Sequence, residues 1–237
     1  MLFKTDGTKY FAMPVLFAFI LICSSCEEVI NVILDDDTVC GEDVYTGYQP
    51  VSNHALEMTA ALNPQTRLVF KNAAAEEMVL TLKEVREQKA PMPYKNLCYN
   101  VSYNTSQDEY CDVQMLDYIF VDAAHNAEIW YSWYVDHSGE MIYDVFSTSV
   151  RVNNYQIGGS NMWVADNRSQ QLPEKLTAPN EWERTVGDTT MLGRPFQDVT
   201  YHNWGVNKGK GFFFQKGVGI VALWAENEAF WVLDRVQ

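Results

Sequence analysis

The chain has 237 residues and a formal net charge of −14, from 17 basic and 31 acidic side chains. A surface with this excess of negative charge repels phosphate backbones and anionic lipid, so nucleic acid is a poor candidate partner. The length suits one large domain or two small ones.

The first 25 residues have the features of an export signal. Lys4 and Lys9 precede an apolar run over residues 11–22, which contains Pro14. At about 1.5 Å per residue this run reaches roughly 18 Å, well short of the ~30 Å hydrocarbon core of a bilayer. The segment therefore predicts a signal peptide over residues 1–25 and not a permanent membrane span.

Ser24, Ser25 and Cys26 end the apolar run and resemble the lipobox of bacterial lipoproteins, in which small residues precede an acylated cysteine. The resemblance implies that Cys26 receives a diacylglycerol and that the preceding peptide is removed. Each buried CH₂ of such a chain contributes about 0.8 kcal/mol, so the lipid would be a stable anchor. Cys23 stands where the family prefers Leu or Val. Lipidation at Cys23, or cleavage as an ordinary secreted protein, therefore stays open.

An acidic stretch follows the cysteine. Glu27 and Glu28 resemble the surface-export signal of Bacteroidota lipoproteins, which implies the outer membrane and favours its cell-surface leaflet. The acidic and glycine residues that continue to residue 50 predict a solvated tether over residues 26–50. Asp35, Asp36 and Asp37 are adjacent and point in different directions. A calcium loop instead needs carboxylates at alternating positions, so we expect no calcium site here.

Three cysteines remain in the exported chain: Cys40, Cys98 and Cys111. Cys98 and Cys111 flank a polar loop, and in an oxidising compartment we expect them to form a disulfide. Closing this loop of about 14 residues would contribute on the order of 3 kcal/mol. Cys40 is then left over as a thiol or as a link to another chain, although a pairing with Cys98 or Cys111 stays open. No C-x-x-C or histidine spacing accompanies these residues, so neither a metal nor a cofactor is predicted.

Residues 51–237 predict a single β-rich domain. A short helix is expected over residues 53–62, ended by Asn63 and Pro64. The clearest strand pattern is a hairpin of residues 128–135 and 140–152 around Asp136-His137-Ser138-Gly139. Residues adjacent in a turn do not converge as nucleophile, base and orienter, so this sequence predicts a turn and not a catalytic triad.

Other period-two segments precede and follow this hairpin. They cover residues 67–71, 77–85, 98–103, 113–121, 196–201, 212–214, 219–224 and 230–233. A loop is expected from Gly158 to Pro179. About ten short strands separated by polar breaks predict an all-β fold, which is either an antiparallel sandwich or a curved, barrel-like meander.

The C-terminal part adds a second resemblance. Residues 193–199, Phe213-Phe214, residues 217–222 and residues 231–233 form an aromatic strand, a Gly-x-Gly-Ile-Val strand and an aromatic closing strand. This order is similar to the C-terminal part of many Bacteroidota outer-membrane lipoproteins. The resemblance covers the signal and roughly the last 45 residues. It implies a β-rich exported lipoprotein and assigns no catalytic residue.

The seven tryptophans fall into two groups. Those in predicted strands are expected in the core: Trp130, Trp133, Trp224 and Trp231. Those in or beside predicted loops have polar neighbours that suit a ligand: Trp163, Trp182 and Trp204, with Asn161, Asp166 and Asn203. Flat aromatic faces beside amides and carboxylates suit sugar rings, whose C–H faces stack while their hydroxyls form hydrogen bonds. The alternative is that these tryptophans only cover loops and sheet ends.

Catalytic motifs are missing from the sequence. The four histidines have no metal-ligand spacing, and there is no Gly-x-Ser-x-Gly elbow, phosphate loop or dinucleotide fingerprint. We therefore expect a non-enzymatic module that binds a glycan or another ligand. The alternatives are a structural or assembly partner in an outer-membrane complex and, less favoured, a hydrolase with a carboxylate dyad.

Overall fold

The computed structural model describes residues 40–100, 105–138, 141–153, 155–164, 183–202, 210–224 and 229–237. The chain divides into two compact units: residues 1–43 with 96–108, and residues 44–95 with 109–237. The larger unit holds the central strands, the core and the candidate site. Among the described residues, no helix has the length and apolar character needed to cross a membrane.

Strands dominate the described part of the chain. The first seven are β1 (Val44–Gln49), β2 (Arg67–Lys71), β3 (Glu77–Asn100), β4 (Thr105–Asp122), β5 (Ala127–Ser138), β6 (Met141–Val152) and β7 (Tyr155–Val164). The last five are β8 (Glu183–Met191), β9 (Arg194–His202), β10 (Gly211–Gln215), β11 (Gly219–Trp224) and β12 (Trp231–Val236). The helix α2 (Asn53–Leu56) lies between β1 and β2.

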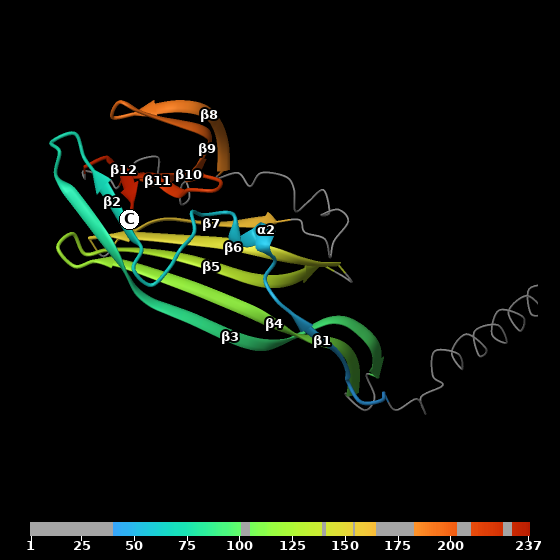
Figure 1. Cartoon of the computed structure of the whole chain (residues 1–237). Helices are drawn as coiled ribbons and strands as arrows, with labels where there is room; N and C mark the ends of the chain where they lie inside the picture. Colours follow the sequence, from blue (N-terminus) through green and yellow to red (C-terminus); the bar gives the residue numbers. More distant parts are fainter. Residues whose placement is uncertain are drawn as a thin grey trace, which may run out of the picture. The chain divides into compact units, whose positions relative to one another are not determined.

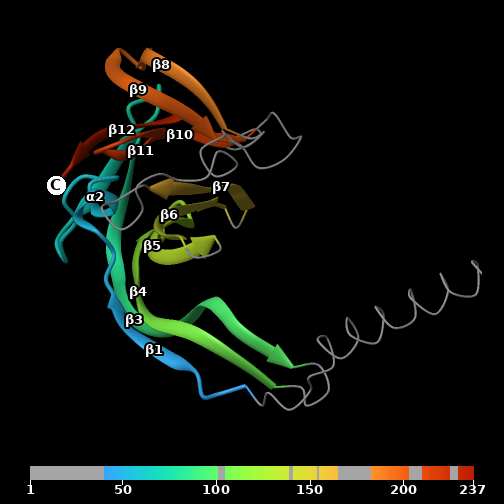
Figure 2. The same cartoon turned by 90° about the vertical axis from the view of Figure 1, so that its right-hand side faces the viewer.

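One sheet contains these strands in the order β7-β6-β5-β4-β3-β2-β12-β11-β10-β9-β8, and β1 pairs in parallel with β4. Within the larger unit the sheet curls. Strands β2–β4 and β8–β12 form the curve, and β5, β6 and β7 lie inside it (Figure 1, Figure 2). The predicted all-β fold is confirmed, and the alternative that holds is the curved, barrel-like meander. The sheet has two edge strands on this path, β7 and β8.

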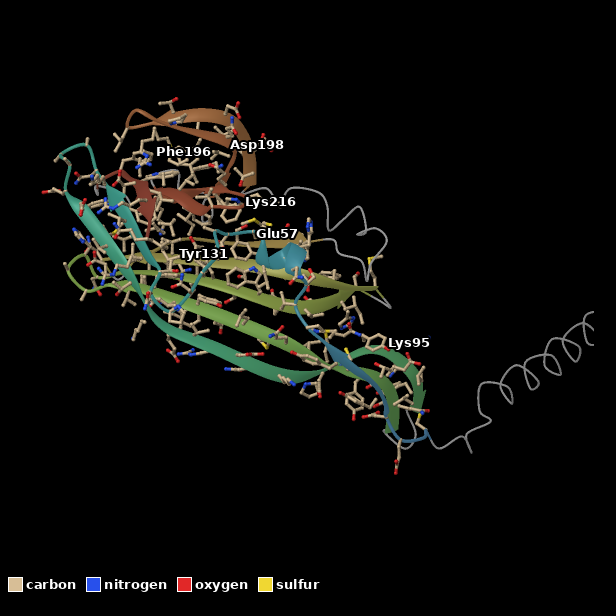
Figure 3. The ribbon with its side chains drawn as sticks, in the orientation of Figure 1. Glu57, Lys95, Tyr131, Phe196, Asp198 and Lys216 are labelled. Atoms are coloured by element: carbon tan, nitrogen blue, oxygen red, sulfur yellow. The ribbon has the colours of Figure 1, made fainter. Side chains whose placement is uncertain are left out.

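The central hairpin forms as the alternating pattern predicts. From Ala127 to Asp136 along β5, buried and half-buried residues alternate, because successive side chains of a strand point to opposite faces. Tyr131, labelled in Figure 3, lies on the buried face, where its hydroxyl accepts a hydrogen bond of 3.0 Å from the backbone N–H of Ile220. Trp133 lies on the same face and pairs across the strands with Phe146.

The helix is shorter than expected. Ser52 caps its N-terminus, with its hydroxyl accepting from the Ala55 N–H at 3.2 Å. The predicted continuation to residue 62 does not form, because the chain joins the sheet instead. Thr59 bridges to Val218, and the Ala60 N–H donates to the Val218 carbonyl at 3.3 Å. Tertiary pairing here overrides the local helix preference.

Three strands were not expected from the sequence: β1, β7 and β8. In β7, Gly158 and Gly159 indicated a loop, but Gly158 serves packing. A Cβ atom at Gly158 would lie 2.6 Å from Cδ1 of the buried Phe212 ring. In β8, Gly187 has a positive φ of 78° between two irregularities in the pairing with β9. β1 pairs with β4 from Val44, so paired structure begins before residue 51.

The cysteines differ from the expected arrangement. Cys111 lies on β4 as a fully buried thiol, so the predicted bond between Cys98 and Cys111 is wrong. Cys40, expected to be left over, is disulfide-bonded. The side chain of Cys98 and all of Cys26 lie outside the described residues. Lipidation of Cys26 therefore stays a prediction.

Candidate functional site

Two of the six predicted ligand residues lie on one strand. Asn161 and Trp163 are in β7, where Asn161 is exposed and Trp163 is half-buried. Trp163 was expected in or beside a loop, but it is a strand residue on a regular ladder with β6. The other four lie outside the described residues: Trp182, Trp204, Asp166 and Asn203.

The strand tryptophans do not all pack in the core. Trp133 and Trp231 are buried as predicted, with 2% and 5% of their surface exposed. Trp130 lies on the opposite face of β5 from Trp133, so its predicted place in the core is wrong. Trp224 is half-buried and stacks on Tyr201, with ring centroids 5.3 Å apart. The face of β4–β7 that Trp130 and Trp163 share is called the outer face below.

A row of polar side chains crosses the outer face at a single register. Asp117 on β4 pairs with Ser132 on β5, Ser132 with Ser147 on β6, and Ser147 with Asn161 on β7. The Ser132 hydroxyl donates to Asp117 Oδ1 at 2.5 Å, and the Ser147 hydroxyl donates to Asn161 Oδ1 at 2.7 Å. These four residues are called the polar row. Asp117, Ser132 and Ser147 lie in strands that the sequence predicted, but Asn161 was expected in a loop, and only the strand register joins the four residues.

Aromatic side chains lie in the registers on both sides of the polar row. On one side, Met115, Tyr134, Val145 and Trp163 occupy one register across β4, β5, β6 and β7. Tyr134 and Trp163 pack with Tyr143 and Val145 in a small hydrophobic cluster separate from the main core. On the other side, Trp130 lies opposite Ser149. The polar row is therefore bordered by large rings.

A hollow of about 420 Å³ opens at the β6–β7 end of the row. It is lined by Ser147, Thr148, Ser149, Gln156, Gly159, Ser160, Asn161 and Trp163. Gln156 is held in place, because its Nε2 donates to the Ser149 hydroxyl at 2.8 Å and to the Gly158 carbonyl at 3.2 Å. Gly159 has no side chain to fill the space. Sequence reasoning missed Ser149 and Gln156, although the alternation of residues 147–150 was a usable signal.

The two arginines described on the outer face near this hollow are paired with glutamates. Arg151 forms an ion pair with Glu128, with 3.6 Å between Nη1 and Oε1. Arg86 binds Glu84 and lies over the Trp130 ring, 5.7 Å from its centroid.

The neighbouring tyrosines are neutral. Burial, and secondly the charge of Asp136, raise the pKa of both Tyr134 and Tyr143, so their hydroxyls stay protonated near neutral pH. The hollow thus offers hydroxyls, amides and ring faces in place of net charge.

Two other hollows have a different chemistry. One of about 500 Å³ lies between the α2 segment and the inner face, lined by Leu56, Ala60, Ala61, Leu62, Tyr118 and Trp133 with Asn53, Glu57 and Thr59. One of about 620 Å³ lies beside the C-terminal residue Gln237 and is lined by residues 64–66 of a loop, Arg67 of β2, and Thr81 and Leu82 of β3. In the first hollow, Trp133 is almost fully buried and apolar side chains of residues 56–62 form much of the lining, and in the second the lining contains no aromatic ring.

The titratable groups outside the hollow have structural roles. His202 is 1% exposed and stacks on Phe212 with 5.0 Å between ring centroids. Burial lowers the pKa of His202 to about 4, so it is neutral at pH 7. Burial alone would raise the pKa of Asp122. Hydrogen bonds from the His125 side chain and from the backbone amides of Val79, His125 and Ala124 lower it instead, and they tie the β4–β5 turn to β3.

The structure also describes the possible metal ligands and the Asp136-His137-Ser138 segment. No group of three or more candidate metal ligands occurs within the described ranges. Asp136, His137 and Ser138 are the last residues of β5 and pair with Tyr143, Ile142 and Met141. The turn predicted for these three residues is therefore wrong, because they belong to the strand pairing.

Comparisons with known proteins do not add to this picture. No family model, curated protein or solved structure matches the chain. The chemistry of the outer face is therefore the basis on which a function can be argued.

Proposed function

We propose that this chain is a non-enzymatic glycan-binding module, displayed on the outer membrane by a lipid on Cys26. The observation that supports binding is the hollow in which the Trp163 ring borders Asn161, Gln156, Ser147 and Ser149. The proposed localisation rests on the lipobox-like sequence alone.

Sugar recognition is what this set of groups can do. A pyranose presents C–H groups on its faces and hydroxyls at its rim. An indole face stacks on the former, and amides and hydroxyls both donate to and accept from the latter. The hollow is open to solvent, and its lining holds no carboxylate or histidine that could activate the buried Thr148 and Ser160 hydroxyls. These features support binding without turnover.

The decisive experiment is titration of the exported domain with neutral oligosaccharides, followed by isothermal calorimetry. Trp163→Ala should weaken binding at least tenfold, because stacking area is lost. Asn161→Ala should weaken it less. The matched control is Tyr45→Ala, which removes an exposed ring on β1 that is 52% accessible and distant from β7 in the strand order.

The outcomes separate clearly. Selective loss in the Trp163 variant, with an unchanged unfolding midpoint, supports the proposal. Equal loss in both variants, or no binding to any glycan at millimolar concentration, contradicts it. The anchor is tested separately by mass spectrometry of the native protein, where a diacylated N-terminal Cys26 is expected and an unmodified N-terminus would overturn the placement.

A second candidate function is that of an assembly partner, as the sequence also allowed. The observation that favours it is the exposed apolar surface of β1, where Val44, Tyr45 and Tyr48 are 40%, 52% and 38% accessible. Tyrosine is common in protein interfaces. Crosslinking of native cells should then yield a complex with a partner protein. Tyr45→Ala should reduce the amount of this complex, and Trp163→Ala should not.

A further inference from the structure

We infer that the outer face binds a neutral, linear oligosaccharide laid across the strands, from Asn161 on β7 to Asp117 on β4. The inference rests on the proposed function and assigns to it a class of ligand and a direction. It starts from the polar row, which the hollow at β6–β7 occupies only at one end.

The length of the row argues for a chain and against a single sugar. Asp117, Ser132, Ser147 and Asn161 are direct cross-strand neighbours on four consecutive strands. Neighbouring strands lie about 4.8 Å apart, so the row spans about 14 Å. One sugar ring covers only part of this span, whereas several linked rings cover all of it.

Hydrogen-bonding capacity is present along the whole row. Asp117 Oδ1 accepts from Ser132, and within the described residues its second carboxylate oxygen is left to accept from sugar hydroxyls. The Asn161 carbonyl accepts from Ser147, so the Asn161 amide NH₂ keeps two donors. Acceptors at one end and donors at the other match hydroxyl groups, which act as both.

Ring faces are spaced along the same direction. Trp163 on β7 and Tyr134 on β5 border one side of the row, with Val145 of β6 between them. Trp130 borders the other side on β5, where Arg86 covers one of its faces. Trp163 and Tyr134 therefore lie on alternate strands, as they would to contact separate sugar rings of one chain.

Charge decides between neutral and acidic glycans. The side chains that face the row include the carboxylate of Asp117. Of the described cations, Arg151 pairs with Glu128 and Arg86 with Glu84, while the Lys210 ammonium keeps its charge and donates to the Gln156 carbonyl on β7 at 3.0 Å. At the β4 end of the row, a uronic acid or a sulfated sugar would meet the Asp117 carboxylate, and Arg86, the described cation that interacts with Asp117, is already paired with Glu84. The ligand class is therefore neutral.

The test compares chain lengths on the intact exported domain. Gluco-, manno- and xylo-oligosaccharides from monosaccharide to hexasaccharide are the probes, and calorimetry gives the affinities. Affinity should rise with length until the row is filled. Ser132→Ala and Asp117→Asn should weaken the longest chains about tenfold, a typical loss for one or two hydrogen bonds. They should leave the shortest bound ligand unaffected, because it occupies only the β6–β7 hollow.

The matched controls lie on β8, which is at the other edge of the sheet. Thr190→Ala removes an exposed hydroxyl and Asp188→Asn an exposed carboxylate, and neither should change any affinity. Circular dichroism of Ser132→Ala confirms that a loss of binding is not a loss of fold.

Three results would overturn the inference while the proposed function stands. They are an affinity independent of chain length, equal effects of Ser132→Ala on short and long chains, and tighter binding of uronic or sulfated chains than of neutral ones. Failure of every probe to bind would instead contradict the proposed function itself.

Discussion

The two faces of β5–β7 differ in what their side chains do, although both come from the same strands. On the inner face, Trp133 is nearly fully buried and its Nε1 donates to the Ala55 carbonyl at 2.8 Å. On the outer face, Trp130 and Trp163 are half-buried beside hydroxyls and amides. A tryptophan therefore stabilises the fold or borders a surface site according to which face of the sheet its position in the strand points to. Residue type alone does not decide this.

The largest effect should come from the inner face. Phe146 is fully buried, and its ring lies 5.0 Å from that of Trp133 and 5.4 Å from that of Phe214. Phe146→Ala should lower the free energy of unfolding by about 3–5 kcal/mol, because it leaves a cavity among rings that cannot close in. Urea unfolding followed by tryptophan fluorescence measures this. A loss below about 1 kcal/mol would mean that the inner face is not the core.

A comparable loss in the free energy of unfolding should follow when the pH is lowered, because the buried His202 becomes protonated. Burial lowers its pKa to about 4, below the value near 6.5 of the unfolded chain. The unfolded state therefore binds the proton first, so stability is complete above pH 6.5 and falls as the pH drops toward 4. The total is at most about 3 kcal/mol.

The contribution of His202 to the pH dependence of stability can be distinguished from that of the carboxylates. His202→Phe keeps a ring against Phe212 but cannot be protonated, so its stability should change little between pH 7 and about 4.5. His54→Gln removes an exposed histidine and should keep the wild-type slope. Asp122 and Asp234 have lowered pKa values. Their protonation therefore lowers the free energy of unfolding only below about pH 4. An unchanged slope in His202→Phe would contradict the assignment.

A smaller loss is expected where β7 meets β10. Gly158→Ala places a Cβ atom 2.6 Å from Cδ1 of Phe212, and that ring is fully buried. The expected loss is about 1–3 kcal/mol, since the ring must shift within a packed core. Thermal unfolding measures it. Gly187→Ala is not a clean control, because Gly187 has a positive φ; Ala124→Gly in the β4–β5 turn serves as an exposed comparison.

The smallest change in stability should come from the outer face. Ser147→Ala removes the 2.7 Å hydrogen bond to the exposed Asn161. The free energy of unfolding should change by no more than about 1 kcal/mol. Glycan affinity should nevertheless fall several-fold, because the Asn161 amide loses its fixed orientation. A large loss of stability with unchanged affinity would reverse the roles given to the two faces.

Alternation in the sequence determined much of the fold. The segments 67–71, 128–135 and 219–224 lie in strands as predicted, because a period of two reports one buried and one exposed face wherever a strand forms. The candidate site was partly accessible in the same way. Asn161 and Trp163 were singled out by residue type, and Ser147 and Ser149 stand on the polar side of a predicted strand.

Only the tertiary structure decided the rest. Gly158 and Gly159 indicate a loop when read locally, and their place in β7 depends on the Phe212 ring that packs against Gly158. The polar row exists because four strands share one register, and a register between Asp117 and Asn161 is set by intervening pairings that no local pattern specifies. Likewise, alternation shows that β5 has two faces, but contacts of Tyr131 with β11 and of Trp133 with α2 select the one that becomes the core.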